Sequence, residues 1–311
     1  MGELFGIIFS VTFGYAVLRV TTPILFAALG ALISDKAGVI NIALEGIMLT
    51  SALTGVIVSA WTGSAWLGLL GAIVIGALVG LLLAYFALNL KTNIILSGIA
   101  LNLMASGGTI FLLYVVAKDK GISSSLNSKV LPTWDIPLIE HIPVLGPIIS
   151  GHNVLTYIAF LAVLLIFILL YKTPLGLQIR AVGENEHAAD SVGISVKKIK
   201  YIALTMSGVL AGLGGAYMSM GYVSWFARNM TAGRGFIALA AEAMGGATPI
   251  GTLLTSLFFG LADALSNNLQ SLRVPAEFIQ MIPYIATLFG LAIYASSKKS
   301  RIRKLKKKNI K

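Results

Sequence analysis

The chain has 311 residues, of which 57% are hydrophobic and only 11% are charged. Soluble domains carry about a quarter charged residues, and no polar stretch here is long enough to bury a core of its own, which excludes a separate soluble domain. The net charge is +11, and nine of the basic residues that contribute to it lie at positions 298–311. It therefore indicates a basic tail beside anionic lipid, not nucleic-acid binding.

Ten apolar segments follow one another along the chain and predict an all-α membrane protein with about ten transmembrane or partly spanning helices. They lie near 5–18, 22–33, 41–60, 66–88, 92–116, 154–171, 200–222, 235–247, 250–269 and 278–295. The segments 22–33 and 235–247 are too short to cross a bilayer comfortably, so we expect each to be tilted, broken or re-entrant. Residues 1–297 then form a single transmembrane domain, followed by the tail.

A short repeat predicts internal symmetry. The sequence GVINIAL at 38–44 reappears as GRGFIAL at 233–239, and a glutamate follows each copy, Glu45 and Glu242. Segments two to five and seven to ten are then two copies separated by one crossing, which makes them an inverted repeat. Glycines at single helix faces predict close backbone packing at Gly76, Gly80, Gly208, Gly212 and Gly215.

Residues 172–200 form a charged loop with five basic and three acidic residues, directly after the uncharged run Val154–Tyr171. The excess of Lys and Arg places this loop in the cytoplasm. The tail is then also cytoplasmic, while residues 117–153 and both Arg228 and Arg234 lie outside. Within the loop we expect a short helix from about Asn185 to Val192, ended by a glycine.

Catalytic and metal-binding motifs are not found in the sequence. There is no G-x-x-x-x-G-K-[ST] loop for ATP phosphates, and the three histidines form no cluster at metal-ligand spacing. Cysteine is absent, which excludes disulfides and thiolate chemistry. We therefore expect a protein that is not an enzyme and that carries no cofactor or metal.

Polar and aromatic residues within or beside the apolar segments are candidates for a solute pathway, because such groups are costly in lipid. They are Asn41, Glu45, Asn102, Trp225, Phe226, Glu242, Asn267 and Asn268. Trp225 and Phe226 follow Tyr222 and predict an aromatic surface at the outer end of a helix, with an interfacial aromatic belt as the alternative. Arg19 and Asp263 are further ionisable residues in apolar segments, and the sequence supplies no partner for Asp263.

The stretch Gly176–Asp190, GLQIRAVGENEHAAD, is followed by Gly193-Ile194 and Lys197-Lys198. It resembles the cytoplasmic loop of permease subunits of bacterial ABC importers, in the branch that handles ribose-type sugars, branched-chain amino acids and nucleosides. Ser207–Tyr217 resembles the next helix of that family. The resemblance implies that the loop docks an ATPase subunit through Glu184, Glu186, Ala188, Ala189, Asp190 and Gly193.

Two further stretches, Thr21–Met48 and Gly233–Asn268, are most similar to permeases that work with nucleoside-binding lipoproteins. The resemblance implies a multi-pass permease of the cell membrane that imports nucleosides by alternating access. Its implied partners are the ATPase, a second homologous permease chain and an extracytoplasmic solute-binding lipoprotein. An importer of a ribose-type sugar or an amino acid is the alternative, followed by an ion-coupled carrier, which the lack of a titratable relay disfavours.

Overall fold

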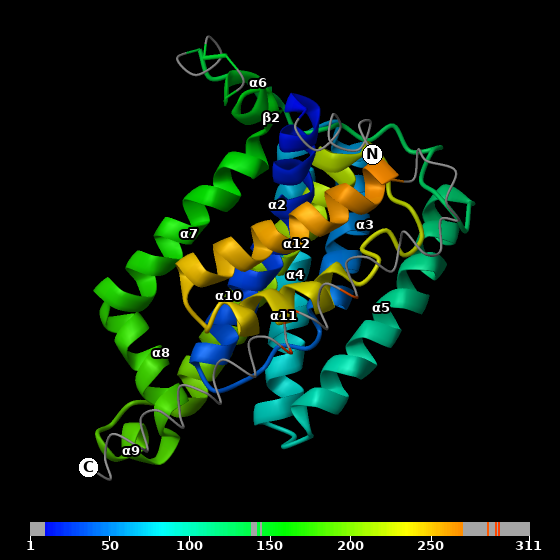
Figure 1. The fold of residues 1–311 in the computed structure, drawn as a ribbon. Helices are drawn as coiled ribbons and strands as arrows, with labels where there is room; N and C mark the ends of the chain where they lie inside the picture. The colour runs from blue at the N-terminus through cyan, green and yellow to red at the C-terminus, as the bar shows by residue number, and fades with distance from the viewer. Residues whose placement is uncertain are drawn as a thin grey trace.

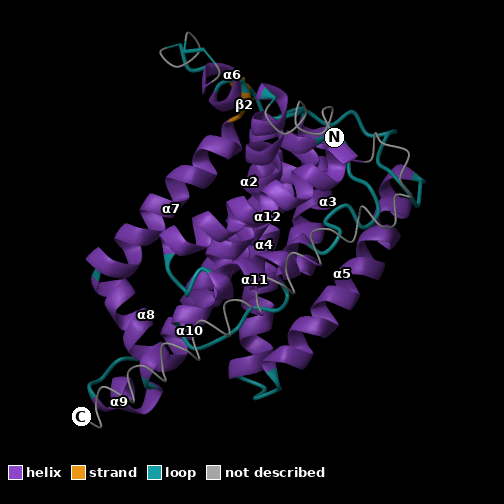
Figure 2. Ribbon diagram, in the orientation of Figure 1, coloured by secondary structure: helices purple, strands orange, loops and turns teal. Residues whose placement is uncertain are grey.

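The computed structural model describes residues 10–137, 142–143 and 145–269, together with the single positions 285, 290 and 292. Helices dominate these residues (Figure 2). In chain order the elements are α2 (Val11–Lys36), α3 (Leu44–Thr62), α4 (Ala65–Leu88), α5 (Ile94–Ala117), β1 (Thr133–Trp134), α6 (Leu145–Ile149), β2 (His152–Asn153), α7 (Val154–Lys172), α8 (Pro174–Glu184), α9 (Glu186–Ser191), α10 (Val196–Tyr217), η1 (Met218–Tyr222), α11 (Arg234–Met244) and α12 (Pro249–Leu269).

Seven helices in the described ranges are long and apolar enough to cross a membrane: α2, α3, α4, α5, α7, α10 continued by η1, and α12. Such helices satisfy every backbone polar group internally, as lipid requires. The prediction of an all-α membrane protein is confirmed. The predicted last segment, 278–295, lies almost entirely outside the described residues.

Helix α2 corrects one prediction. The sequence separated 5–18 from the short segment 22–33, but one continuous helix runs from Val11 to Lys36. Arg19 marked the apparent break. Its guanidinium lies 4.4 Å from the centroid of the Tyr222 ring and donates a hydrogen bond to the Tyr222 carbonyl oxygen. Because a distant residue satisfies this charge, the helix continues through it, and 22–33 is not a separate partial crossing.

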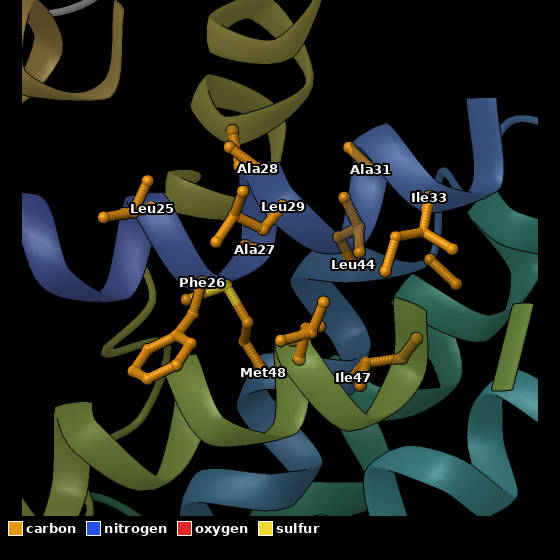
Figure 3. Packing of buried hydrophobic residues seen from close by; sticks show 14 of the residues in the cluster. Leu25, Phe26, Ala27, Ala28, Leu29, Ala31, Ile33, Leu44, Ile47 and Met48 are labelled. Carbon is orange, nitrogen blue, oxygen red and sulfur yellow. The ribbon is translucent and has the colours of Figure 1, made fainter. Parts of the chain in front are cut away.

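The core lies around the second half of α2, where Leu25, Phe26 and Leu29 are fully buried. Figure 3 shows these side chains beside Ile47 and Met48 of α3, which are also fully buried. Helices in lipid are held mainly by such packing, since the surrounding lipid tails are as apolar as the side chains themselves. α2 is thus an interior helix, whereas α5 and α7 expose most of their surface.

The glycine spacing predicted close backbone packing on α4 and on α10, and the structure shows that the two helices pack on each other. A Cβ atom added at Gly76 would lie 2.5 Å from the Gly208 carbonyl oxygen, and one added at Gly208 would lie 2.3 Å from the Gly76 carbonyl oxygen. Neither position has room for a larger residue. Glycine is therefore required here for the two helices to touch.

The packing supports the inverted repeat. α10 packs along α4 while α2 packs along α12, and α10 also contacts α3 while α2 contacts α11. The first helix of each copy therefore packs on the second and third helices of the other copy. α10 is the fifth crossing after α2, so the two run in opposite directions. The loops that lead into α3 and α11 also share a left-handed glycine, Gly38 at φ 73° and Gly233 at φ 80°.

α11 is short, as the segment 235–247 predicted. Its 11 residues rise about 16 Å, roughly half of the hydrocarbon thickness of about 30 Å. It forms a hairpin with α12, in which the Thr255 hydroxyl donates a hydrogen bond to the Ala241 carbonyl oxygen at 2.5 Å. α11 therefore begins within the bundle, near the centre of Figure 1.

The two ends of the bundle carry different structures (Figure 1). At one end β1 and β2 form a small antiparallel pair, and the Tyr15 ring of α2 stacks on His152 with 3.9 Å between ring centroids. At the opposite end α8 and α9 extend beyond the bundle. The short helix expected near Asn185–Val192 is confirmed as α9. α8 was not predicted, although Thr173 and Pro174 give it a typical start.

Candidate functional site

The first candidate site is the charged segment, which we define as residues 172–200. Asn185 separates its two helices and caps the second, since the Asn185 side chain accepts a hydrogen bond from the Ala188 amide at 3.0 Å. Gly193 follows α9 with φ 85°, a conformation that favours glycine. Both boundaries of α9 are thus set by local chemistry, which is why the sequence could predict this helix.

Contacts with the bundle hold the charged segment in place. A Cβ atom at Gly183 would lie only 2.2 Å from the Lys36 carbonyl oxygen, so α8 presses directly on the end of α2. Glu186 forms an ion pair with Lys200 of α10. The hydrogen bond from Lys200 lowers the pKa of the Glu186 carboxyl, because it stabilises the charged form. Displacement of α8 is therefore opposed by α2, and displacement of α9 is opposed by α10.

The surface of α9 differs in one respect from the prediction. Glu184, Glu186, Ala188, Asp190 and Gly193 are exposed, but Ala189 is only 3% exposed and packs against the chain's own core. Ala189 therefore fixes α9 to the bundle and is not available to a partner. This corrects the expectation that Ala189 contacts the ATPase subunit. Val192 is 76% exposed directly after the helix. No sequence pattern singled out this apolar side chain, since its exposure depends on how α9 packs against the rest of the chain.

The second candidate site is a polar junction inside the bundle, where α3 meets α11. The Glu45 carboxylate accepts hydrogen bonds from the Thr231 hydroxyl at 2.6 Å, the Gly233 amide at 2.8 Å and the Gly235 amide at 2.7 Å. These amides belong to the start of α11, where the helix dipole favours a negative charge. Glu45 therefore caps α11 from a helix nearly two hundred residues away in sequence.

Beside this junction, an ion pair joins α11 to α12. Arg234 Nη2 is 2.8 Å from Asp263 Oδ2, with the two side chains 13% and 12% exposed. Asp263 thus has the partner that the sequence did not reveal. The sequence scheme placed Arg234 outside the membrane; in the structure Arg234 is the first residue of α11 and its side chain is mostly buried. Loss of either partner would leave the other charge buried and uncompensated, which is strongly destabilising.

Two asparagines that were predicted to lie in the solute pathway are found beside this junction. They stabilise the return loop, which we define as residues 37–43 between α2 and α3. Asn41 donates to the Ser207 hydroxyl at 2.9 Å and accepts from the Ala43 amide at 3.0 Å. Asn102 accepts from the Gly46 amide at 2.8 Å and donates to the Ile42 carbonyl oxygen at 2.9 Å. Both amides are thus occupied by the chain itself.

The remaining predicted residues are dispersed. Glu242 lies on α11 and is 6% exposed, and its Oε1 has no hydrogen-bond partner among the described residues. Asn267 and Asn268 lie at the far end of α12, where Asn268 donates to the Ala264 carbonyl oxygen at 2.9 Å. The structure therefore brings Asn41, Glu45 and Asn102 together around the start of α3, but it does not join them to α12's asparagines.

The predicted aromatic surface is divided. Tyr222 holds Arg19, and Phe226 is fully buried, with its amide donating to the Ser123 hydroxyl at 2.8 Å. Trp225 is 45% exposed. It lines a hollow of about 560 Å³ together with Ser224 and residues 122–128, which include four serines. Trp225 is thus the most exposed member of this trio, whereas Tyr222 is partly exposed and Phe226 is buried.

Comparisons with known proteins agree on the type of protein. The family profile "Branched-chain amino acid transport system / permease component" matches residues 15–291. The chain is 36% identical over 285 residues to the nucleoside ABC transporter permease protein NupC of Lactococcus lactis, covering 88% of this chain and 89% of that protein. It is 37% identical over 302 residues to the guanosine ABC transporter permease protein NupQ of Bacillus subtilis, covering 93% and 92%.

A third relative carries a different substrate in its name. The putative glucose ABC transporter permease protein TsgC13 of Haloferax volcanii is 36% identical and covers 84% of this chain and 79% of that protein. Among solved structures, PsaBC from Streptococcus pneumoniae in complex with Fab has a TM-score of 0.54 and 16% identity, covering 93% of this chain and 94% of that chain. That likeness concerns the fold alone. The chain is a multi-pass membrane protein and belongs to the permease component family of branched-chain amino acid transport systems.

Proposed function

We propose that this permease is the membrane subunit of an ATP-driven importer for nucleosides. The observation that carries the proposal is its identity of 36% and 37% to permeases named for nucleosides and guanosine, over 88% and 93% of the chain. ATP is hydrolysed by a separate subunit. A second, homologous permease completes the membrane unit, and an extracytoplasmic lipoprotein delivers the solute.

The charged segment supports the coupling role. α9 exposes Ala188 and Val192, a small and an apolar side chain that suit a groove on the ATPase. Burial of Ala189 and the pairing of Glu186 with Lys200 tie the same helix to the bundle. A helix held this firmly transmits the movement of a docked ATPase to α10, whereas a flexible linker would absorb it.

The polar junction suits an uncharged solute. Glu45 is bound to the start of α11, and Arg234 is paired with Asp263. Charged side chains that already have partners do not attract an ionic solute. Breaking an existing pair so that one of its side chains could bind a charged solute would cost free energy in a low-dielectric interior. A nucleoside is neutral and carries a flat base with a polar edge, which fits this environment better than an amino acid does.

Orientation follows from the same segment. α8 and α9 lie at the end of the bundle opposite β1 and β2 (Figure 1), and we place α8, α9 and the basic C-terminal tail in the cytoplasm, because loops rich in Lys and Arg stay on that side. Trp225 and its serine-lined hollow then face the outside, where the lipoprotein arrives.

Uptake of radiolabelled guanosine, adenosine, uridine and ribose tests the proposal, in cells with and without the permease gene. We expect the gene to be required for nucleoside uptake, and Val192→Glu to abolish that uptake while Val192→Ala retains most of it. Import of a sugar is the second candidate, favoured by the relative from Haloferax volcanii. Gene-dependent uptake of ribose or glucose with unchanged nucleoside uptake would establish the sugar instead.

A further inference from the structure

α9 is too small to hold an ATPase subunit by itself. It has six residues and is about 9 Å long. A specific, stable protein–protein interface buries about 800 Å² on each partner and involves roughly 20–30 residues a side. Even with its flanking residues, α9 supplies a small part of that area. A stable ATPase contact therefore needs a further surface on this chain.

Such a surface lies beside α9, at the same end of the bundle. A hollow of about 570 Å³ lies between the end of α2, the end of α7 and the second half of α8. Its lining residues are Asp35, Lys36, Gly38, Ile40, Tyr171, Arg180, Gly183 and Glu184. Glu184 is the last residue of α8, one residue before the cap of α9. The hollow is thus continuous with the proposed docking helix.

The charged residues of this hollow are not paired with one another. Over the described ranges the chain forms two ion pairs, Lys200 with Glu186 and Arg234 with Asp263. Asp35, Lys36, Arg180 and Glu184 take part in neither. The Arg180 guanidinium lies 5.1 Å from the centroid of the Tyr171 ring, and its buried Nε has no hydrogen-bond partner in the described part of the chain.

Two positive and two negative side chains around one hollow match a protein surface better than a lipid surface. Anionic lipid headgroups attract basic side chains and repel Asp35 and Glu184, whereas a protein partner supplies both signs. Ile40 adds an apolar side chain that is 47% exposed at the rim. Unpaired charges around an exposed apolar residue are typical of the rim and centre of a protein interface.

We infer that the ATPase subunit contacts a second patch on this permease, formed by Asp35, Lys36, Ile40, Arg180 and Glu184. The inference rests on the proposed function and extends it, because α9 is then one of two contacts. The second patch includes Ile40 of the return loop, which leads directly into α3, where Glu45 bonds the Gly235 amide of α11. ATPase movement at the patch can therefore reach α3 and the capped start of α11 through the return loop, and not only through α9 and α10.

Photo-crosslinking in the purified, full transporter complex tests this inference. The chain has no cysteine, so a benzophenone maleimide can be placed on Ile40→Cys, on Val192→Cys and on Trp61→Cys, which is 71% exposed at the opposite end of α3. Unsubstituted permease measures background labelling. We expect Ile40→Cys and Val192→Cys to crosslink to the ATPase subunit, identified by mass spectrometry, and Trp61→Cys not to.

The outcomes separate this inference from the proposed function. Crosslinking from Val192→Cys but only background from Ile40→Cys would leave α9 as the docking helix and overturn the second patch. Capture of lipid alone at Ile40→Cys would do the same. Background from both positions would overturn ATPase docking at this end of the chain, and the second patch with it.

Charge reversal supplies an independent measurement. We expect Arg180→Glu to reduce the ATPase retained on tagged permease by about tenfold, which corresponds to about 1.4 kcal/mol. Lys120→Glu makes the same change of charge at an exposed residue just after α5, at the opposite end of the bundle, and we expect full retention. Equal retention by the two variants, at equal permease yield, would contradict the second patch.

Discussion

The Glu45 carboxylate accepts a hydrogen bond of 2.7 Å from the Gly235 amide, which joins the first turn of α3 to the first turn of α11. The contact is close on both sides, since a Cβ atom at Gly235 would lie 2.5 Å from the Glu45 backbone nitrogen. α11 spans only part of the bundle, so its first amides would otherwise meet lipid or a cavity without an acceptor. Glu45 is what allows a half-length helix to begin there.

Removing this cap should loosen α11. We expect Glu45→Ala to lower the free energy of unfolding by about 1–2 kcal/mol, the effect of losing a helix N-cap, and to lower the thermal transition in detergent. Hydrogen exchange should rise in the first turn of α11 and remain unchanged in α7. Asp135→Ala, at an exposed position in the loop between α5 and α7, is the control. Unchanged exchange in α11 would show that Glu45 does not hold it.

The pair of Arg234 and Asp263 should behave as a unit. Asp263→Ala leaves a buried arginine without its partner, and breaking such a pair costs about 3–5 kcal/mol. We therefore expect a strong loss of folded protein from Asp263→Ala. The double variant Arg234→Met with Asp263→Leu removes both charges and should recover most of the yield. A double variant as unstable as the single one would mean that packing, not charge, is the cause.

Gly183 should tolerate no side chain. A Cβ atom there would lie 2.2 Å from the Lys36 carbonyl oxygen, so Gly183→Ala must displace α8 from α2. We expect lost transport, with the bundle still inserted in the membrane. Gly107→Ala is the matched control, because nothing lies within 4 Å of a Cβ at that helical position. Normal uptake by both variants would show that the contact of α8 with α2 is dispensable.

Impermeant thiol reagents can establish the orientation, since the chain has no cysteine of its own. Ser124 and His187 are both exposed, at opposite ends of the bundle. We expect Ser124→Cys to react in intact cells and His187→Cys to react only after lysis. The reverse pattern would place α9 outside the cell and would remove the basis for ATPase docking.

The attachment of α9 to α10 should depend on pH. The hydrogen bond and charge of Lys200 lower the pKa of Glu186 below its ordinary value of 4.5. A group with a lowered pKa stabilises the fold above its ordinary pKa, and this contribution is lost as the pH falls through the lowered value. A fluorophore on Val192→Cys should therefore gain mobility in acid.

The variant Glu186→Gln provides the comparison for this effect. The fluorophore should be mobile in that variant at every pH, because the amide carries no charge for Lys200. Fluorescence anisotropy measures the mobility with and without the substitution. If acid mobilised the fluorophore equally in the two proteins, a group other than Glu186 would be responsible for the pH dependence.

The sequence was sufficient for features that depend on neighbouring residues. Runs such as Val154–Tyr171 predict helices because lipid leaves the backbone no other way to satisfy its polar groups. The helix α9 was predicted because its cap, Asn185, and the glycine that follows it, Gly193, both act locally. The short α11 and the close packing at the glycines of α4 and of α10 also followed from spacing along the chain, although the spacing did not show that these two helices are partners.

Tertiary structure decided the features that join distant residues. Arg19 appeared to end a helix, yet Tyr222 lets α2 continue through it. Asp263 had no visible partner until α11 placed Arg234 beside it. The role of Glu45 depends on an amide 190 residues further along the chain, and Ala189 is covered by the bundle, not by a partner. Hydropathy and helix propensity describe each residue in its own segment, whereas hydrogen bonds and burial depend on which segments the packing brings together.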